Sequence, residues 1–235
     1  MKNSLFTLVL ATLSLAAAAQ TAPGTARPAT AAAAPVGYAE PMAQAIADIT
    51  STGDAAQLHA LASKMERAAA VAPADWLPRY YQAYALVISV FQGKEGSDAK
   101  DKTLDQAEAA LAQARQLGGD GSELLTLQAY AYQARLGIAP MLRAQQYSGM
   151  VDEAVAQAQA LNPANPRAYL VAANNVYFTP QMFGGGAEAA KPLYETAKAK
   201  YAAFRPAGPL MPNWGQSQLL ERLKRYEGGA AQAGK

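Results

Sequence analysis

The sequence contains no cysteine and a single histidine, His59, among its 235 residues. A chain without cysteine cannot form disulfides, use a thiolate as a nucleophile or bind a metal through sulfur. One histidine cannot supply the imidazole pair of a typical zinc site, so we predict no metal site and expect His59 on the face of a helix over 54–72. No serine lies in a G-x-S-x-G motif. We therefore predict no cofactor and no enzymatic activity, although carboxylates that meet only in the folded chain are left open.

Charge is sparse and nearly balanced. Lysine and arginine total 20 and aspartate and glutamate 18, which gives a formal net charge of +2. Because the chain shows no basic cluster, we exclude nucleic acid as a partner. Two segments with acidic residues, 96–101 and 118–123, lack the ligand spacing of a calcium loop and are typical of helix caps and soluble turns.

The N-terminus has the layout of a secretory signal peptide over residues 1–19. Lys2 precedes a mostly apolar run from Leu5 to Ala19 that ends in three small residues. At about 1.5 Å per residue the run is roughly 22 Å long, too short for a ~30 Å hydrocarbon layer. We predict cleavage after Ala19 and a periplasmic or secreted protein without an integral membrane span. An uncleaved membrane anchor is the alternative.

The remaining chain divides by composition. Residues 20–37 are rich in alanine and proline and lack apolar periodicity, which predicts a disordered linker. Residues 38–227 carry the periodic apolar pattern and are predicted to form one helical repeat domain. Residues 228–235 are predicted to be a disordered tail.

An internal repeat organises the predicted domain. The fragment Gln-Ala-Tyr-Ala occurs at 82–85 and again at 128–131, 46 residues later. Four apolar sets also share a spacing of four and then three residues, which lines one face of a helix. These sets are Leu61-Met65-Ala68, Ala107-Leu111-Ala114, Val151-Val155-Ala158 and Ala190-Tyr194-Ala197.

A stop and a restart follow each of the first three of these helices. Pro73 precedes Asp75, two glycines precede Ser122, and Pro163 precedes Asn165. Aspartate, serine and asparagine are N-cap residues, so each predicts the start of a new helix. Small residues at Ala83, Ala129 and Ala173 follow the last alanines of the first three sets by the same interval. The chain is therefore predicted to be a series of helix pairs with a constant joint.

With these features, the chain resembles a divergent tetratricopeptide repeat (TPR) protein from about Glu40 to Tyr226. The resemblance implies an all-α fold, an α-solenoid of about four antiparallel helix pairs, with a C-terminal capping helix over 214–226. The pattern alanines recur after 46, 44 and 39 residues, against about 34 in the family. We expect the additional residues to form turn loops within the pairs, at 93–102, 137–149 and 180–186.

The glycines Gly184 to Gly186 lie in the third predicted loop. They precede a helix, as a phosphate-binding loop would, but Gly186 is followed by Ala187 and Glu188 and not by Lys and Ser/Thr. We therefore interpret them as a tight turn in which glycine supplies positive φ angles.

The TPR resemblance also implies a binding face. It places eight residues toward a concave groove, namely Tyr80, Tyr84, Tyr130, Gln133, Arg167, Leu170, Asn174 and Tyr177. Tyrosine combines apolar area with a hydroxyl, which suits recognition, and groove asparagines such as Asn174 commonly hold a peptide backbone in the family. The alternative is that these tyrosines merely fill the space between helices.

Our main functional prediction is an exported scaffold that binds a peptide or partner protein in this groove. The alternative is a periplasmic solute-binding or envelope-enzyme accessory protein that encloses a small ligand. An open groove would favour the scaffold, and a deep closed cavity lined by the tyrosines would favour the small ligand. The sequence does not indicate an oligomeric state.

Overall fold

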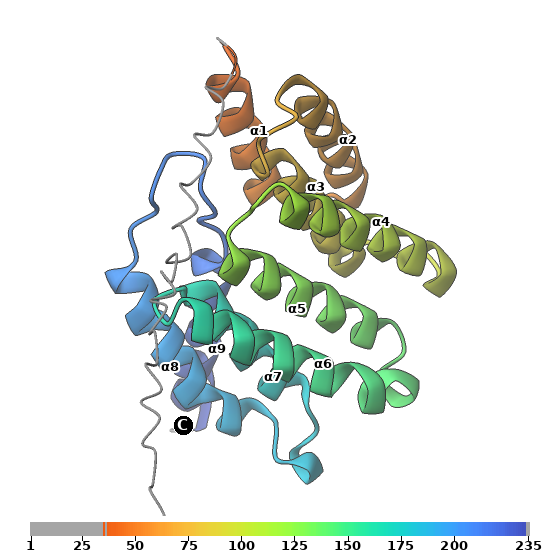
Figure 1. Ribbon diagram of the computed structural model, residues 1–235. Helices are drawn as coiled ribbons and strands as arrows, with labels where there is room; N and C mark the ends of the chain where they lie inside the picture. The colour runs from red at the N-terminus through yellow and green to blue at the C-terminus, as the bar shows by residue number, and fades with distance from the viewer. Residues whose placement is uncertain (1–34, 36, 234–235) are drawn as a thin grey trace, which may run out of the picture. The chain divides into compact units, whose positions relative to one another are not determined.

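The structure, a computed structural model, describes residue 35 and residues 37–233, and the predicted signal peptide lies outside these residues (Figure 1). Every regular element in this part of the chain is a helix, which confirms the predicted all-α class. None of the described helices is both long and apolar enough to cross a membrane. The elements are α1 (Ala39–Ser51), α2 (Ala55–Val71), α3 (Leu77–Gln92), α4 (Ser97–Gln116), α5 (Gly121–Ile138), α6 (Pro140–Leu161), α7 (Pro166–Phe178), the 3-10 turn η1 (Gln181–Phe183), α8 (Ala187–Ala203) and α9 (Gln216–Ala233).

The helices pack as successive pairs. Helix α3 lies against α4, α5 against α6, and α7 against α8, while α4 also contacts α5 and α6 contacts α7. The first helices of the pairs form a row in which α5 contacts both α3 and α7. We call α3, α5 and α7 the inner row. Each pair thus packs mainly on the pairs next to it in the sequence, as in repeat proteins.

The small residues at the predicted joints lie where helices approach most closely. Ala83, Ala129 and Ala173 of the inner row are fully buried, and so are Ala114 and Ala158 of the second helices. A methyl group at these positions lets two helix backbones approach closely. The predicted register is therefore confirmed at these joints.

Two of the three predicted turn loops are wrong. Helix α4 begins at Ser97, inside the predicted loop over 93–102. Helix α6 begins at Pro140, and only Ala139 separates it from the end of α5. Proline is favoured in the first turn of a helix, so the chain reverses at Ala139 and continues as helix. The extra residues of the repeat thus lengthen α4 and α6 to 20 and 22 residues, against 13 in α7.

The third predicted turn forms as expected. After α7, η1 leads into Gly184 and Gly186, which have φ angles of 83° and 97°. The Gly186 N–H donates to the Val176 carbonyl at 2.9 Å and so ties the turn back to α7. Glycine is required at these two positions because other residues rarely adopt such φ angles.

Side-chain caps begin two of the inner-row helices, α5 and α7. The Asn165 side chain accepts a hydrogen bond from the Arg167 N–H at 3.1 Å, as predicted for the start of α7. At α5 the cap is Asp120 and not the predicted Ser122: Asp120 accepts from the Glu123 N–H at 2.9 Å. The Ser122 hydroxyl instead donates to the Ala158 carbonyl at 2.8 Å and ties α5 to α6.

The chain after α8 crosses back over the inner row. Residues 204–215, which we call the closing segment, form no helix and lead into α9, which packs against α8. The Tyr81 hydroxyl of α3 donates to the Leu210 carbonyl of this segment at 3.0 Å. Helix α9 continues to Ala233, within the segment predicted as a tail.

Candidate functional site

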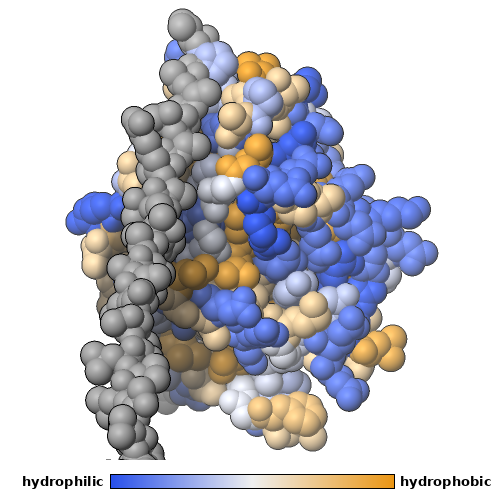
Figure 2. All heavy atoms as spheres, in the orientation of Figure 1, coloured by the Kyte–Doolittle hydropathy of each residue, from blue (hydrophilic) through white to orange (hydrophobic). Residues whose placement is uncertain are grey.

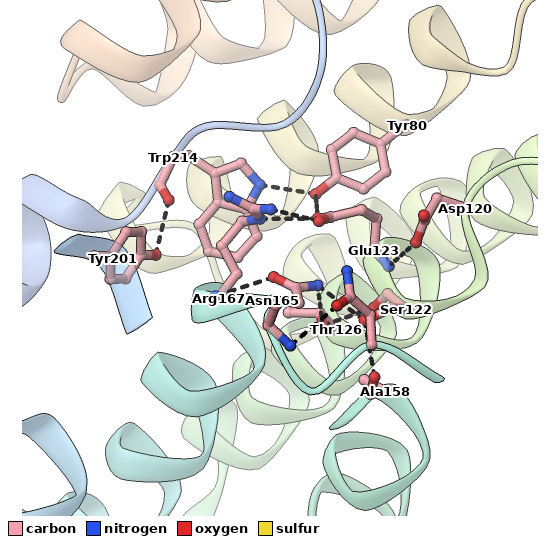
Figure 3. Close-up of polar contacts among 12 residues, drawn as sticks. Tyr80, Asp120, Ser122, Glu123, Thr126, Ala158, Asn165, Arg167, Tyr201 and Trp214 are labelled. Atoms are coloured by element: carbon pink, nitrogen blue, oxygen red, sulfur yellow. Dashed lines mark hydrogen bonds and ion pairs between the residues drawn. The ribbon is translucent and has the colours of Figure 1, made fainter. Parts of the chain in front are cut away.

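Trp214 of the closing segment stacks on two tyrosines of the inner row. Its ring lies 4.8 Å from that of Tyr84, at an interplanar angle of 21°, and 5.5 Å from that of Tyr130, at 10°. Its indole N–H donates to the Tyr80 hydroxyl at 2.8 Å (Figure 3). Only 3% of Trp214 is exposed, and both tyrosines are buried. The chain's own tryptophan therefore occupies the part of the inner row where an external ligand was predicted.

The backbone at Trp214 and Gly215 also contacts neighbouring side chains. The Tyr201 hydroxyl of α8 donates to the Trp214 carbonyl at 2.9 Å. Gly215 follows with a φ of 97°, and a side chain there would collide with the Tyr201 hydroxyl and with Leu170. This point of the closing segment thus requires glycine.

A buried ion pair lies beneath the closing segment (Figure 3). Arg167 of α7 binds Glu123 of α5 through two nitrogens, and its Nε lies 2.8 Å from Oε2 of Glu123. The Tyr80 hydroxyl lies 3.3 Å from the same oxygen, which links the pair to Trp214. Phe204 covers the Arg167 guanidinium, 4.5 Å from its ring centre. Burial raises the pKa of the Glu123 carboxyl, and the neighbouring guanidinium offsets only part of this effect.

Aromatic side chains remain accessible beyond Trp214, at the C-terminal ends of the inner-row helices. Phe91, at the end of α3, is 43% exposed and packs 4.9 Å from the Tyr130 ring. Phe178, at the end of α7, is 69% exposed and packs edge-on against Tyr177 at 5.0 Å. Planar apolar groups exposed in this way suit contact with a ligand or partner.

Helix α9 connects these two aromatic pairs. The Gln218 side chain donates to the Tyr130 hydroxyl at 3.2 Å. One turn later, the Arg222 guanidinium lies over the rings of Tyr177 and Phe178, 4.1 and 5.3 Å from their centres. We call this set the aromatic rim: Phe91, Tyr130, Tyr177, Phe178, Gln218 and Arg222.

Further apolar residues are exposed at the neighbouring turns. Met182 and Phe183 protrude from the turn between α7 and α8, and Met141 and Leu142 from the start of α6. Hydrophobic residues stand out at these two turns on the face drawn in Figure 2. Because large apolar side chains are usually buried, such a gathering indicates a contact surface.

A separate shallow groove lies on the outer side, between α6, α7 and α8. Its volume is about 300 Å³, and its lining includes Val155, Ala172 and Leu193, with Asp152 at its edge. This volume is at the lower end of the range for small-molecule sites. The lining contains no cation, so the groove is poorly suited to an anionic ligand.

Searches against protein-family models and against curated proteins find no match. Among solved structures, the chain is similar to the HusA haemophore from Porphyromonas gingivalis, with a TM-score of 0.72 and 36% sequence identity. The match covers 80% of this chain and 92% of that chain. The chain belongs to the HusA haemophore family. The TPR resemblance stays a prediction, because the matched structure is described only as a haemophore.

Membership of the HusA family corrects the predicted function. The main prediction, a scaffold that binds a peptide or protein in an open groove, is wrong, because HusA is named as a carrier of haem, a small planar ligand. The closing segment provides the physical reason, since Trp214 covers Tyr84 and Tyr130 and leaves no open groove there. The alternative prediction of a protein for a small ligand fits this family better.

All eight predicted binding residues of this HusA-family chain lie on the inner row. Six are buried, and only Gln133 and Tyr177 are partly exposed. Gln133 donates to the Val171 carbonyl at 2.7 Å, and Asn174 accepts from the Tyr194 hydroxyl at 2.8 Å, so both join neighbouring helices. Leu170 belongs to the core between α7, α8 and α9.

The sequence did not indicate Trp214, Arg222, Phe91 or Phe178 as site residues of the HusA-family fold. Trp214 and Arg222 lie in the predicted capping helix, whose path over the inner row no spacing pattern reveals. His59 lies partly buried on α2. Among the described residues, no group of three or more histidine, cysteine, aspartate and glutamate side chains could hold a metal ion.

Proposed function

We propose that this chain is an exported haem-binding protein that carries haem or a closely related porphyrin. The observation that supports the proposal is the 36% identity to the HusA haemophore over 92% of that protein's chain. The signal-peptide layout of residues 1–19 supports export, because it matches the charged, apolar and small-residue regions of secreted proteins.

Haem would be held by this chain mainly through contact with its macrocycle. Protein ligands to haem iron are commonly histidine, cysteine, methionine or tyrosine. The chain has no cysteine, and its single histidine lies partly buried on α2, which is not one of the three inner-row helices. Exposed phenylalanines and methionines offer the flat and apolar contacts that a tetrapyrrole requires.

A titration of the mature protein with haemin tests this function. We expect saturable binding, detected by the change in haem absorbance and by quenching of tryptophan fluorescence. Iron-free protoporphyrin IX should bind with similar affinity, because the macrocycle supplies most of the contacts. His59→Ala should bind haemin as tightly as the parent protein.

Two outcomes would contradict the proposal. If neither haemin nor protoporphyrin IX binds saturably, the chain does not share the ligand of HusA. If haemin binds but His59→Ala abolishes binding, an axial histidine and not the aromatic surface holds the ligand. Palmitate, an apolar but flexible carboxylate, serves as the control for non-specific apolar binding.

A further inference from the structure

The chemistry of haem sets two requirements for its site. The macrocycle is flat and largely apolar, whereas one edge carries two propionate carboxylates. A protein surface that binds both parts needs aromatic or aliphatic side chains with a cation at their margin. This inference rests on the proposed function and identifies where these requirements are met.

Arg222 is a cation at the margin of accessible aromatic rings. Its guanidinium lies 4.1 Å from the centre of the Tyr177 ring and 5.3 Å from that of Phe178, and its side chain is partly exposed. A guanidinium that lies over a ring keeps its N–H groups in its own plane, where they can bind a carboxylate through two hydrogen bonds.

Three other arginines of the described chain are already paired with acids. Arg135 binds Asp101, Asp105 and Glu108 in a cluster that Arg143 joins through Asp101, and Arg167 binds Glu123. Arg222 forms no ion pair within residues 37–227. Its charge therefore remains available to an anionic ligand.

The aromatic rim provides the adjoining apolar surface. Gln218 and Arg222 lie four residues apart in α9, a rise of about 6 Å along the helix. Gln218 contacts Tyr130, whose ring packs on Phe91, and Arg222 contacts Tyr177 and Phe178. Residues one helical turn apart on α9 thus contact the two aromatic pairs, and both pairs present an exposed phenylalanine.

We propose that the aromatic rim binds the face of the macrocycle and that Arg222 binds one of its propionates. Phe91 and Phe178 contact the ring system, and α9 brings the cation to its edge. The proposed ligand class is a planar tetrapyrrole with at least one free carboxylate.

The test compares Arg222→Gln with Arg225→Gln in the mature protein. Arg225 is exposed on the same helix and is outside the aromatic rim, so it is a matched control for the loss of one charge. Each variant is titrated with haemin and with haemin dimethyl ester, in which both carboxylates are blocked. We expect Arg222→Gln to weaken haemin binding at least about tenfold, the effect of a lost hydrogen bond to a charged group. Arg225→Gln should bind haemin like the parent.

The ester distinguishes a carboxylate contact from a packing contact. Parent and Arg222→Gln should bind the ester equally, and Arg222→Lys should recover part of the haemin affinity because it keeps the charge without the planar fork. Equal haemin affinities for Arg222→Gln and Arg225→Gln would overturn the assignment, as would equal losses for haemin and the ester. If the parent binds neither compound, the proposed function itself fails.

Discussion

Trp214 contacts three helices of the repeat from outside them. Its ring contacts α3 and α5, its indole N–H binds Tyr80, and its carbonyl accepts from Tyr201 of α8. Aromatic pairs contribute about 0.5–1.5 kcal/mol each beyond the area that they bury. Trp214 therefore joins the two hydrophobic clusters of the described chain: its ring packs in the first, which extends over α1 to α7, and its carbonyl bonds Tyr201 of the second, which extends over α7 to α9.

Replacement of Trp214 by alanine is expected to destabilise the protein strongly. Loss of a large buried aromatic side chain typically lowers the free energy of unfolding by ~3–5 kcal/mol. Urea unfolding monitored by circular dichroism measures this change. Asn213→Ala, at the exposed neighbouring position, should unfold like the parent. If both variants unfold at the same urea concentration, the stacking of Trp214 does not stabilise the fold.

Individual site residues could be predicted only in part. The sequence placed Tyr84, Tyr130 and Tyr177 on one face, because their positions follow from helical spacing within the repeat. It could not show that Trp214 covers the first two or that Arg222 lies over the third, since these contacts depend on the path of a non-helical segment. Spacing patterns describe periodic elements and do not fix where an irregular segment docks.

At the scale of elements, the joints between helices set the geometry of the array. Ala83, Ala129 and Ala173 are fully buried where an inner-row helix approaches its neighbours. Interiors are packed too densely to accept additional methylene groups without displacing a helix. Small residues at these positions therefore determine how closely the pairs can stack.

Ala129→Leu should destabilise the array by ~1–3 kcal/mol, the usual cost of overpacking a dense core. Thermal unfolding provides the measurement. Ala109→Leu introduces the same side chain at an exposed position of α4 and should leave the melting temperature unchanged. Equal melting temperatures for both variants would indicate that α5 is not packed in the observed register.

The sequence predicted the helices better than their ends. The four-then-three spacing identified the buried faces of α4, α6 and α8, because burial on a helix repeats with its turn. In α2 it was displaced, since the buried face is Leu58, Ala62, Met65 and Ala69, and Leu61 and Ala68 are only partly buried. The segment 137–149 was predicted to be a loop because the repeat is longer than about 34 residues there. Its end residues Gly137 and Gly149 also weaken a helix, by roughly 1 kcal/mol each relative to alanine. Both glycines nevertheless lie within helices, since tertiary packing of α5 against α6 outweighs that local preference.

At the scale of the whole described chain, the fold departs from a simple repeat array because residues far apart in the sequence bind each other. Contacts in such arrays are mostly between neighbouring repeats. Here the hydrogen bond from Trp214 to Tyr80 joins residues 134 positions apart, and that from Tyr81 to Leu210 joins residues 129 apart. Helix α3 is thereby linked directly to the closing segment that follows α8, and not only through the intervening helices.

Removal of residues 204–235 is expected to expose the aromatic inner row. Tyr80, Tyr84 and Tyr130 would lose their cover, and an exposed aromatic surface promotes association. We expect increased binding of the dye ANS and concentration-dependent oligomers in light scattering, with helical circular dichroism largely kept. A truncated protein that stays monomeric and binds no more ANS than the full chain would contradict this role of the closing segment.

The closing segment is also among the last parts of the protein to be synthesised, which sets when the fold can be completed. Synthesis proceeds from the N-terminus, so all the inner-row helices are complete before Trp214 leaves the ribosome. Until then the tyrosines of α3 and α5 have no cover, and uncovered apolar surface is where nascent chains misassemble. The last tenth or so of the chain thus completes the fold, which makes the C-terminal end an unfavourable place for a bulky fusion.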